Sequence, residues 1–212
     1  MKYIFVAGAP GSKWSSVVKN IYFSPSIDRT DYSAERTYYH DASGTTQLMH
    51  LGAYFDPGME FGDWFNNSGD GLGGRTKEEH EAEFDRPFSG EGVRIIKSHW
   101  FSYQQNIEYL RETWPECPLV LVHRTDDSCL GWWVRCGHFD ITYPNYQTYE
   151  NLRSMAKIIE AQNTGIQWAN DRLKPHCVYN NTRLVLILGL EQPPAEYKQS
   201  YTEQDINVSV LI

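Results

Sequence analysis

Short runs of consecutive apolar residues alternate along the chain with segments in which apolar residues recur every three or four positions. The first pattern is typical of strands buried on both faces, and the second of amphipathic helices. The predicted strands span residues 3–7, 93–97, 119–123 and 177–179. The predicted helices span residues 15–22, 103–114, 127–136, 149–173 and 184–190. Gly165 interrupts the longest helix, where we expect a bend.

This alternation of strands and helices predicts an α/β fold, specifically a three-layer α/β/α sandwich around a mostly parallel sheet. We expect residues 1–212 to form a single domain. Residues 24–92 fit the alternation least, because a charged surface helix at 77–84 lies among loops. Long loops at the carboxyl ends of strands carry selectivity in such folds, so this segment is predicted to be a loop-rich insertion on the substrate side. The tail 206–212 is interpreted as an edge strand or a partner-binding segment.

Composition and charge narrow the function classes. Of 212 residues 41% are hydrophobic and 22% charged, which is typical of a globular chain and not of a disordered one. No apolar run approaches the ~18 residues of a membrane span, and Pro10 and Gly11 break the apolar start too early for a signal peptide, so we expect a cytoplasmic protein.

The net charge of −8 argues against a nucleic-acid binder, so any anionic ligand must be held by a few placed groups. The four cysteines lack metal-site spacing and are expected to be free thiols, mostly buried.

The first predicted strand runs into GAPGSKWSS, which predicts a phosphate loop like that of the P-loop NTPases. Glycines that turn a strand into a helix present backbone N–H groups at the positive end of the helix dipole. Lys13 adds a charge, and Ser12, Ser15 and Ser16 add hydroxyl groups. Trp14 follows the lysine, so the hydroxyl that holds Mg²⁺ in a Walker A loop is displaced, and we expect phosphate binding without a metal. A tight turn capped by serine is the alternative.

Two further strand ends carry candidate chemistry. Lys97 and His99 follow the second strand, where alternation would point both the same way, as a cation beside a titratable base. Arg124 follows the third strand, where its guanidinium could bind a phosphate. The structural alternatives are a histidine that only supports the fold and an ion pair of Arg124 with Asp126 or Asp127.

Together these segments resemble the sulfotransferases that use 3′-phosphoadenosine-5′-phosphosulfate (PAPS). The segment RIIKSHWF at 94–101 is very close to the family's RIIKTHLP, and LVLVHRTDDS at 119–128 resembles its YLVRNPKDVAVS. VYNN at 178–181 and LILGLE at 186–191 echo its YED and LGLE elements. The stretch in place of the family's PKSGTTW consists of Pro10, Gly11, Ser12, Lys13, Trp14, Ser15 and Ser16.

The resemblance implies a role for each matched residue. Lys97 would stabilise charge on the bridging oxygen, and His99 would be the general base on the acceptor. The loop 10–16 would hold the 5′-phosphosulfate. Arg124 and the nearby Ser128 would hold the 3′-phosphate, and Tyr179 would lie near the adenine. The implied partner is a small-molecule or glycan acceptor with a hydroxyl or amine, facing the insertion at 24–92, and no metal is expected.

Some positions depart from the family's pattern. The loop lysine, Lys13, lies two residues later than in the family, and Trp132 stands where the family has its 3′-phosphate serine. The family's C-terminal RKG…GDWK element is absent. The GDW at 62–64 comes too early in the chain to correspond to it. The chain is also short for the family, which leaves a reduced acceptor site or one completed by a second copy in a homo-oligomer. Two other functions stay open: a small P-loop kinase using Mg·ATP with a carboxylate near Asp126 or Asp127, and a catalytically idle nucleotide-binding protein.

Overall fold

The structure is a computed structural model that describes residues 1–31, 51–56, 71–135, 151–193 and 205–212. The strands are β1 (Tyr3–Gly8), β2 (Ala53–Tyr54), β3 (Arg94–Lys97), β4 (Leu119–His123), β5 (His176–Val178) and β6 (Asn207–Leu211). The α-helices are α1 (Trp14–Tyr22), α2 (Lys77–Asp85), α3 (Gln104–Thr113), α4 (Asp126–Arg135), α5 (Leu152–Leu173) and α6 (Asn181–Ile187). Two 3-10 helices, η2 (Gly71–Gly74) and η3 (Trp100–Ser102), complete the described elements.

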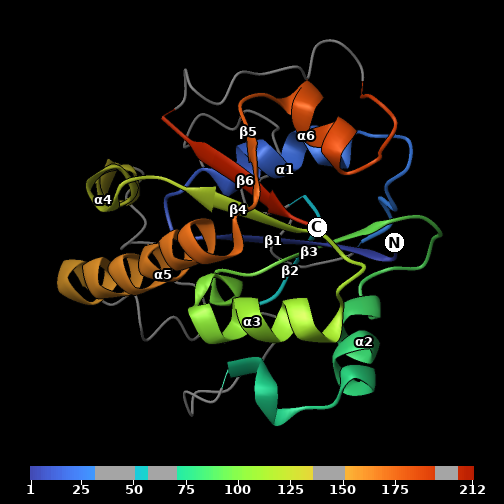
Figure 1. The fold of residues 1–212 in the computed structure, drawn as a ribbon, viewed down its shortest axis with the longest axis horizontal. Coiled ribbons are helices and arrows are strands. Elements are labelled where there is room, and N and C mark those ends of the chain that lie inside the picture. The colour runs from blue at the N-terminus through green and yellow to red at the C-terminus, as the bar shows by residue number, and fades with distance from the viewer. Residues whose placement is uncertain (32–50, 57–70, 136–150, 194–204) are drawn as a thin grey trace.

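The strands form one mixed sheet in the order β2-β3-β1-β4-β6-β5 (Figure 1). The four strands from β2 to β4 in this order run parallel, with Phe5 of β1 opposite Ile96 on one side and Leu119 on the other. β6 runs antiparallel to both of its neighbours. The predicted α/β fold is therefore confirmed. The central position of β1 places the loop that follows it between the ends of β3 and β4.

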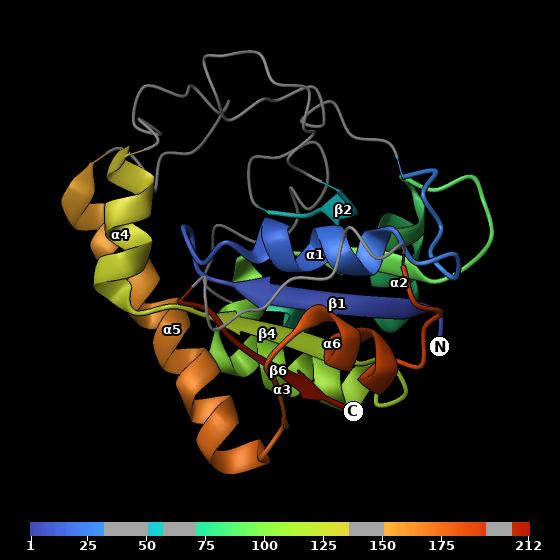
Figure 2. The same cartoon turned by 90° about the horizontal axis from the view of Figure 1, so that it is seen from above.

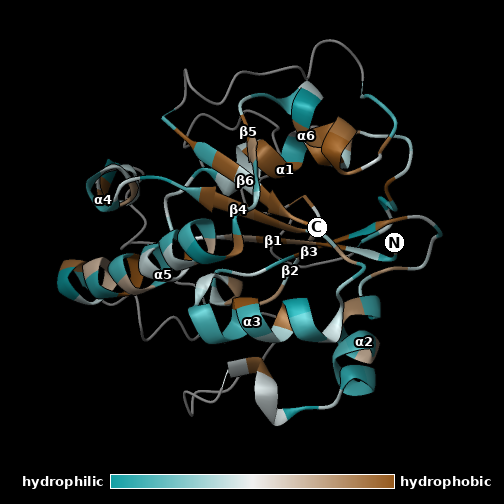
Figure 3. Cartoon of the chain, viewed as in Figure 1, coloured by the Kyte–Doolittle hydropathy of each residue, from teal (hydrophilic) through white to brown (hydrophobic). Residues whose placement is uncertain are grey.

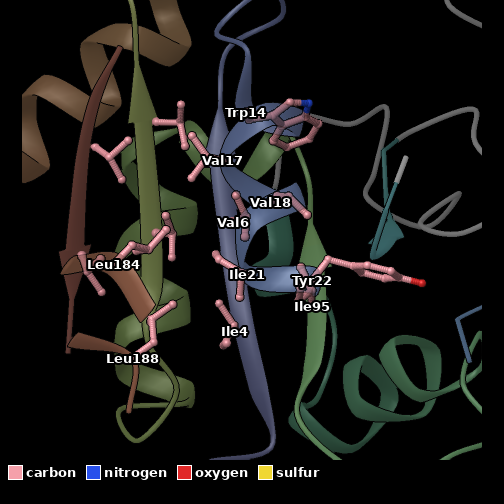
Figure 4. Packing of buried hydrophobic residues seen from close by; sticks show 14 of the residues in the cluster. Ile4, Val6, Trp14, Val17, Val18, Ile21, Tyr22, Ile95, Leu184 and Leu188 are labelled. Atoms are coloured by element: carbon pink, nitrogen blue, oxygen red, sulfur yellow. The ribbon is translucent and has the colours of Figure 1, made fainter. Parts of the chain in front are cut away.

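Side-chain alternation along β1 divides the core between the two faces of the sheet. Ile4 and Val6 pack with the apolar residues of α1 and α6, as Figure 4 shows. Tyr3 and Phe5 face the opposite way, toward apolar residues of α2, α3 and α5. Figures 1 and 2 show these two groups of helices on opposite sides of the strands. In Figure 3 β1 and β4 are mostly brown, whereas α2, α3 and α5 show much teal.

The predicted strands and helices are present, with bounds that differ by at most three residues inside the described ranges. The predicted surface helix begins with a capping box, in which Thr76 and Glu79 each accept from the other's backbone N–H. One strand was missed: β2, which lies inside the segment 24–92. Residues 32–50 and 57–70 of that segment lie outside the described residues.

The expectations for the carboxyl-terminal strands were wrong. The tail is not an edge strand, because β6 lies between β4 and β5, and β5 pairs antiparallel with β6 instead of extending the parallel sheet. Val208 and Val210 of β6 face the core shared by α1 and α6, while Leu211 faces the other core. A strand that can bury apolar side chains on both faces is stable inside a sheet, where both of its backbone edges are paired.

Gly165 does not interrupt the helix, because α5 runs unbroken from Leu152 to Leu173. A close contact with another segment explains why glycine stands at this position. A Cβ atom at Gly165 would lie 2.1 Å from the carbonyl oxygen of Ser102 and 2.8 Å from the amide nitrogen of Gln104. The backbone after β3 approaches α5 so closely that a side chain at this position would collide with it.

We predict that Gly165→Ala destabilises the protein although alanine favours helices. The collision with Ser102 should cost about 1–3 kcal/mol, more than the ~1 kcal/mol gained in helix propensity. Gly131→Ala is the matched control, because Gly131 lies inside α4 with no atom within 4 Å of its added Cβ, and it should raise stability. Urea unfolding at pH 7 measures both variants, and an equal gain in the two would contradict the close approach.

Candidate functional site

The carboxyl ends of β3, β1 and β4 bring the predicted site residues to one edge of the sheet. β3 ends at Lys97, β1 ends at Gly8 and β4 ends at His123, and these strands are parallel neighbours. The loop 9–13 therefore lies between the turn that carries His99 and the turn that carries Arg124. In open α/β sheets this edge is where ligands bind.

The loop after β1 makes a tight turn into α1. The Ser12 N–H donates to the Ala9 carbonyl at 2.9 Å, and Gly11 has a φ of +82°. A Cβ atom at Gly11 would lie 2.2 Å from the carbonyl oxygen of Cys129 in α4, so only glycine fits there. Lys13 is the N-cap of α1, with a left-handed φ of +63° and no side-chain cap. The predicted glycine turn is thus present, while the alternative of a serine cap is not.

The start of α1 has the properties of an anion site. The first N–H groups of a helix lack intrahelical acceptors, and α1 has no acidic residue in its first turn. Ser16 is already committed, because its N–H donates to the Lys13 carbonyl at 2.9 Å. With the Ser12 amide committed as well, the amides left to meet an anion are those of Lys13, Trp14 and Ser15.

The side chains of the loop differ in how much they can offer a ligand. Ser12 is fully buried, and its hydroxyl has no hydrogen-bond partner within the described part of the chain. Pro10 is buried, and Ser15 and Ser16 are half-buried. The Lys13 ammonium lies 5.2 Å from the centroid of the Trp132 ring, and partial burial, together with the charge of Arg124, lowers the pKa of Lys13.

Lys97 and His99 come together on the ring of Trp14. The imidazole of His99 stacks on the indole with ring centroids 3.9 Å apart and an angle of 18°. The Lys97 Nζ lies 5.8 Å from the Trp14 ring centroid and 5.9 Å from that of Tyr54. The predicted proximity is confirmed, but its predicted cause is wrong. The strand ends at Lys97, and His99 has helical dihedrals at the start of η3, so a turn and not strand alternation aims its ring.

The environment of His99 suits a neutral base. Its Nδ1 contacts the Gly8 carbonyl oxygen, and since a carbonyl only accepts, Nδ1 carries the proton in the neutral ring and Nε2 holds the lone pair. Only 6% of the residue is exposed, and this burial lowers the pKa of His99, while the charge of Asp56 acts to raise it. At neutral pH the ring is therefore uncharged and able to take a proton at Nε2.

Asp56 is a residue of this site that the sequence reasoning missed. Its carboxylate lies just beyond β2 and accepts from the Ser98 hydroxyl at 2.6 Å, the Tyr54 hydroxyl at 2.8 Å and the His99 backbone N–H at 2.9 Å. The sequence carried a signal, because the apolar run 51–55 ends in Asp-Pro-Gly, which is typical of a strand followed by a turn.

Arg124 connects the loop to α4. Its Nη1 donates to the carbonyl oxygens of Gly11 at 3.1 Å and Ser128 at 3.3 Å. Neither predicted ion pair forms; instead Nη2 lies 4.0 Å from the Asp205 carboxylate, which also accepts from the Ser128 hydroxyl at 2.9 Å. Asp126 accepts from the amide of Asn163 at 2.6 Å. Arg124 and Ser128 do lie together as predicted, beside a carboxylate that the sequence did not reveal.

Tyr179 stands apart from the loop. It follows β5, and β4 and β6 lie between β5 and β1 in the sheet. Tyr179 is 63% exposed and lines a pocket of about 310 Å³ with residues of β5, β6 and the end of α5. The structure therefore does not bring Tyr179 into contact with the other predicted residues.

The remaining expectations concern cysteines, metals and membranes. Cys117 and Cys129 are buried and Cys177 is exposed, all as free thiols, while Cys136 lies outside the described residues. Among the residues described, no cluster of three or more His, Cys, Asp or Glu side chains could hold a metal ion. In the same residues, no helix is both long and apolar enough to cross a membrane.

Comparisons with protein-family models, with curated proteins and with solved structures find no match to this chain.

We predict that Asp205→Asn strengthens the binding of a polyvalent anion at the loop. Asp205 places a negative charge beside Arg124, and it also acts on Lys13, so it opposes an incoming anion. Calorimetric titration with pyrophosphate should show affinity rising by up to about fivefold, the usual scale for an exposed charge pair. Glu112→Gln on α3 makes the same change of net charge away from the loop, and an equal gain there would mean that net charge alone acts.

Proposed function

We propose that this chain is a sulfotransferase that transfers the sulfuryl group of PAPS to a hydroxyl or amine of a small-molecule or glycan acceptor. The observation that carries the proposal is the meeting of Lys97 and His99 on Trp14, the first residue of the helix whose start forms the anion site. The matching fold would be a P-loop NTPase-like three-layer sandwich, for which helices on both faces of the sheet give support.

The reaction would use the side chains in this arrangement. The amides at the start of α1, with Lys13, would bind the 5′-phosphosulfate, and Ser12 offers a buried hydroxyl that still lacks a partner among the described residues. The acceptor oxygen forms a bond to sulfur as the bond from sulfur to the phosphate oxygen breaks. The acceptor's proton passes to His99 Nε2, and Lys97 meets the negative charge left on the phosphate.

The 3′-phosphate would bind Arg124 by taking the place of the Asp205 carboxylate. Arg124 already uses Nη1 on two carbonyl oxygens, and its Nη2 faces the exposed Asp205. A phosphate at this point would displace that carboxylate and free the Ser128 hydroxyl to donate to it. Arg124 would thus hold the loop and the nucleotide at once, whereas contact of adenine with Tyr179 has less support because β4 and β6 intervene.

Transfer of a sulfuryl group is compatible with a loop that lacks the Walker A hydroxyl. The sulfuryl group carries less negative charge than a phosphoryl group, so fixed amides and cations can stabilise its transfer by preorganisation. The competing kinase function would use a carboxylate near Asp126 or Asp127. Asp126 is bonded to Asn163 in the first turn of α4, which ties it to the packing of α4 on α5.

We predict that the product nucleotide, 3′-phosphoadenosine-5′-phosphate (PAP), binds without a divalent metal. Calorimetric titration with PAP in EDTA should show saturable binding of the same affinity as in Mg²⁺, because the groups proposed to hold it are amides and cations. Mg·ATP is the parallel ligand. Binding of Mg·ATP alone, or a strict need for Mg²⁺, would overturn the proposal in favour of a kinase, and PAP binding without transfer to any acceptor would indicate an idle binding protein.

We predict that His99→Gln lowers turnover by about two to four powers of ten, the usual contribution of a general base, with little change in PAP affinity. Lys97→Met should also lower turnover more than PAP affinity, because its main partner develops in the transition state. Turnover per folded molecule is measured beside the melting temperature.

The matched control is His80→Gln. His80 is also buried, but its Nε2 is bonded to the Leu72 carbonyl at 2.8 Å, away from the loop. If both histidine variants lose stability and keep turnover, His99 supports only the fold.

A further inference from the structure

We propose that Asp56 is the positioning residue of this site, and that its carboxylate holds the turn that sets His99 against Trp14 and balances the charge that His99 gains with a proton. The role as a whole rests on the proposed function, since only the transfer reaction gives His99 a proton to take. The proximity of Asp56 to His99 exists without any substrate, so the coupling between the two groups can be measured in the free protein.

The geometry shows how Asp56 reaches His99. β2 pairs in parallel with β3, so that Tyr54 lies opposite Lys97, and the Phe55 N–H continues the ladder by donating to the Lys97 carbonyl at 2.9 Å. The chain then leaves the strand with the Asp56 carboxylate at the level of Ser98 and His99. Asp56 is only 1% exposed, so β2 delivers a buried acid to the turn after β3.

The Asp56 carboxylate accepts hydrogen bonds from side-chain hydroxyls and from backbone N–H groups. Oδ1 accepts from the Ser98 hydroxyl at 2.6 Å and from the His99 N–H at 2.9 Å, with a longer contact of 3.5 Å from the Trp100 N–H. Oδ2 accepts from the Tyr54 hydroxyl at 2.8 Å. The backbone N–H of His99 can only donate, so its bond to Oδ1 favours the ionised form of the carboxyl group. Burial raises the pKa of Asp56, and the charge of His99 and these hydrogen bonds oppose that rise.

The second part of the role is electrostatic. Within the described part of the chain, the groups around the His99 ring are the Gly8 carbonyl of β1, the rings of Trp14 and Tyr54, the Lys97 ammonium and the Asp56 carboxylate. Lys97 opposes a positive charge on His99, and burial opposes it as well. Asp56 is the negative charge among these groups, so it lets a buried imidazole next to a lysine accept a proton.

The test is the substitution Asp56→Asn in the full chain, read by NMR titration of the His99 ring without any substrate. Asparagine can keep the two bonds at Oδ1 while removing the charge. The proton affinity of His99 should fall about tenfold or more, because an opposite charge at this range usually shifts a titration by at least one unit. With an acceptor available, kcat should fall and the acidic limb of its pH profile should move to lower pH, because that limb reports the pKa of the general base. PAP affinity should stay near that of the wild type.

Two controls separate positioning from mere support of the fold. Asp28→Asn removes another buried carboxylate, which is bonded to Thr30 and lies near Arg94, and should lower stability without moving the His99 titration. Tyr54→Phe removes one hydrogen bond to Asp56 but leaves its charge, and should move the titration much less than Asp56→Asn. A His99 titration unchanged in folded Asp56→Asn would overturn the proposal.

A second measurement covers the case in which Asp56→Asn does not fold. In wild-type protein with ¹³C-labelled aspartate, the carboxyl signal of Asp56 should shift in the same pH step in which His99 titrates. Independent titration of the two groups would overturn the role even without the variant. Because neither measurement uses a nucleotide, failure to bind PAP would count against the sulfotransferase and not against the coupling of Asp56 with His99.

Discussion

The stacking of His99 on Trp14 is the contact on which the candidate site depends. Trp14 begins α1, and the remaining core residues of this helix pack on β1, so the indole is held by the same cluster that covers this face of the sheet (Figure 4). Its ring also meets Tyr54 edge-on and lies near the Lys97 ammonium. One side chain thereby joins the ends of β2 and β3 to the start of the helix that would hold an anion. The core and the chemistry share a residue, so they cannot vary independently.

Burial of this arrangement decides which charges it needs. Lys97 is fully buried and His99 almost so, and a buried charge is costly unless another charge or a set of hydrogen bonds compensates it. Asp56 supplies the opposite charge, and in turn it depends on donors from Tyr54 and the turn after β3. The short strand β2 therefore matters more than its length suggests, because it contains Tyr54 and leads directly to Asp56.

Local signals in the sequence were enough for most elements and for the predicted loop, whereas contacts between distant segments were not. The apolar run before Gly8 and the glycine turn after it identify β1 and the start of α1 from adjacent residues alone. The place of β6 inside the sheet depends on pairing with β4, whose residues 119–123 pair with residues 207–211, and no local pattern distinguishes β6 from an edge strand. Asp205 was missed for the same reason, because it meets Ser128 only across the folded sheet. Gly165 shows that a residue inside one helix can also depend on a distant segment, because the backbone at Ser102 and Gln104 leaves no room for a side chain there.

An acidic chain that binds an anion must gather its cations at one place, and here they come from three segments. Lys13 lies in the loop, Lys97 ends β3 and Arg124 follows β4. A Walker A motif supplies its lysine from the loop-to-helix turn alone. Here the lysine of that turn, Lys13, has a left-handed φ, and its ammonium lies 5.2 Å from the Trp132 ring centroid. Arg124 binds the Gly11 carbonyl, and the N–H of the same peptide unit, that of Ser12, turns to Ala9. Both ends of that peptide unit are therefore in use, and Arg124 holds the loop against α4. An anion would meet the next three amides, at the start of the helix where the dipole is strongest.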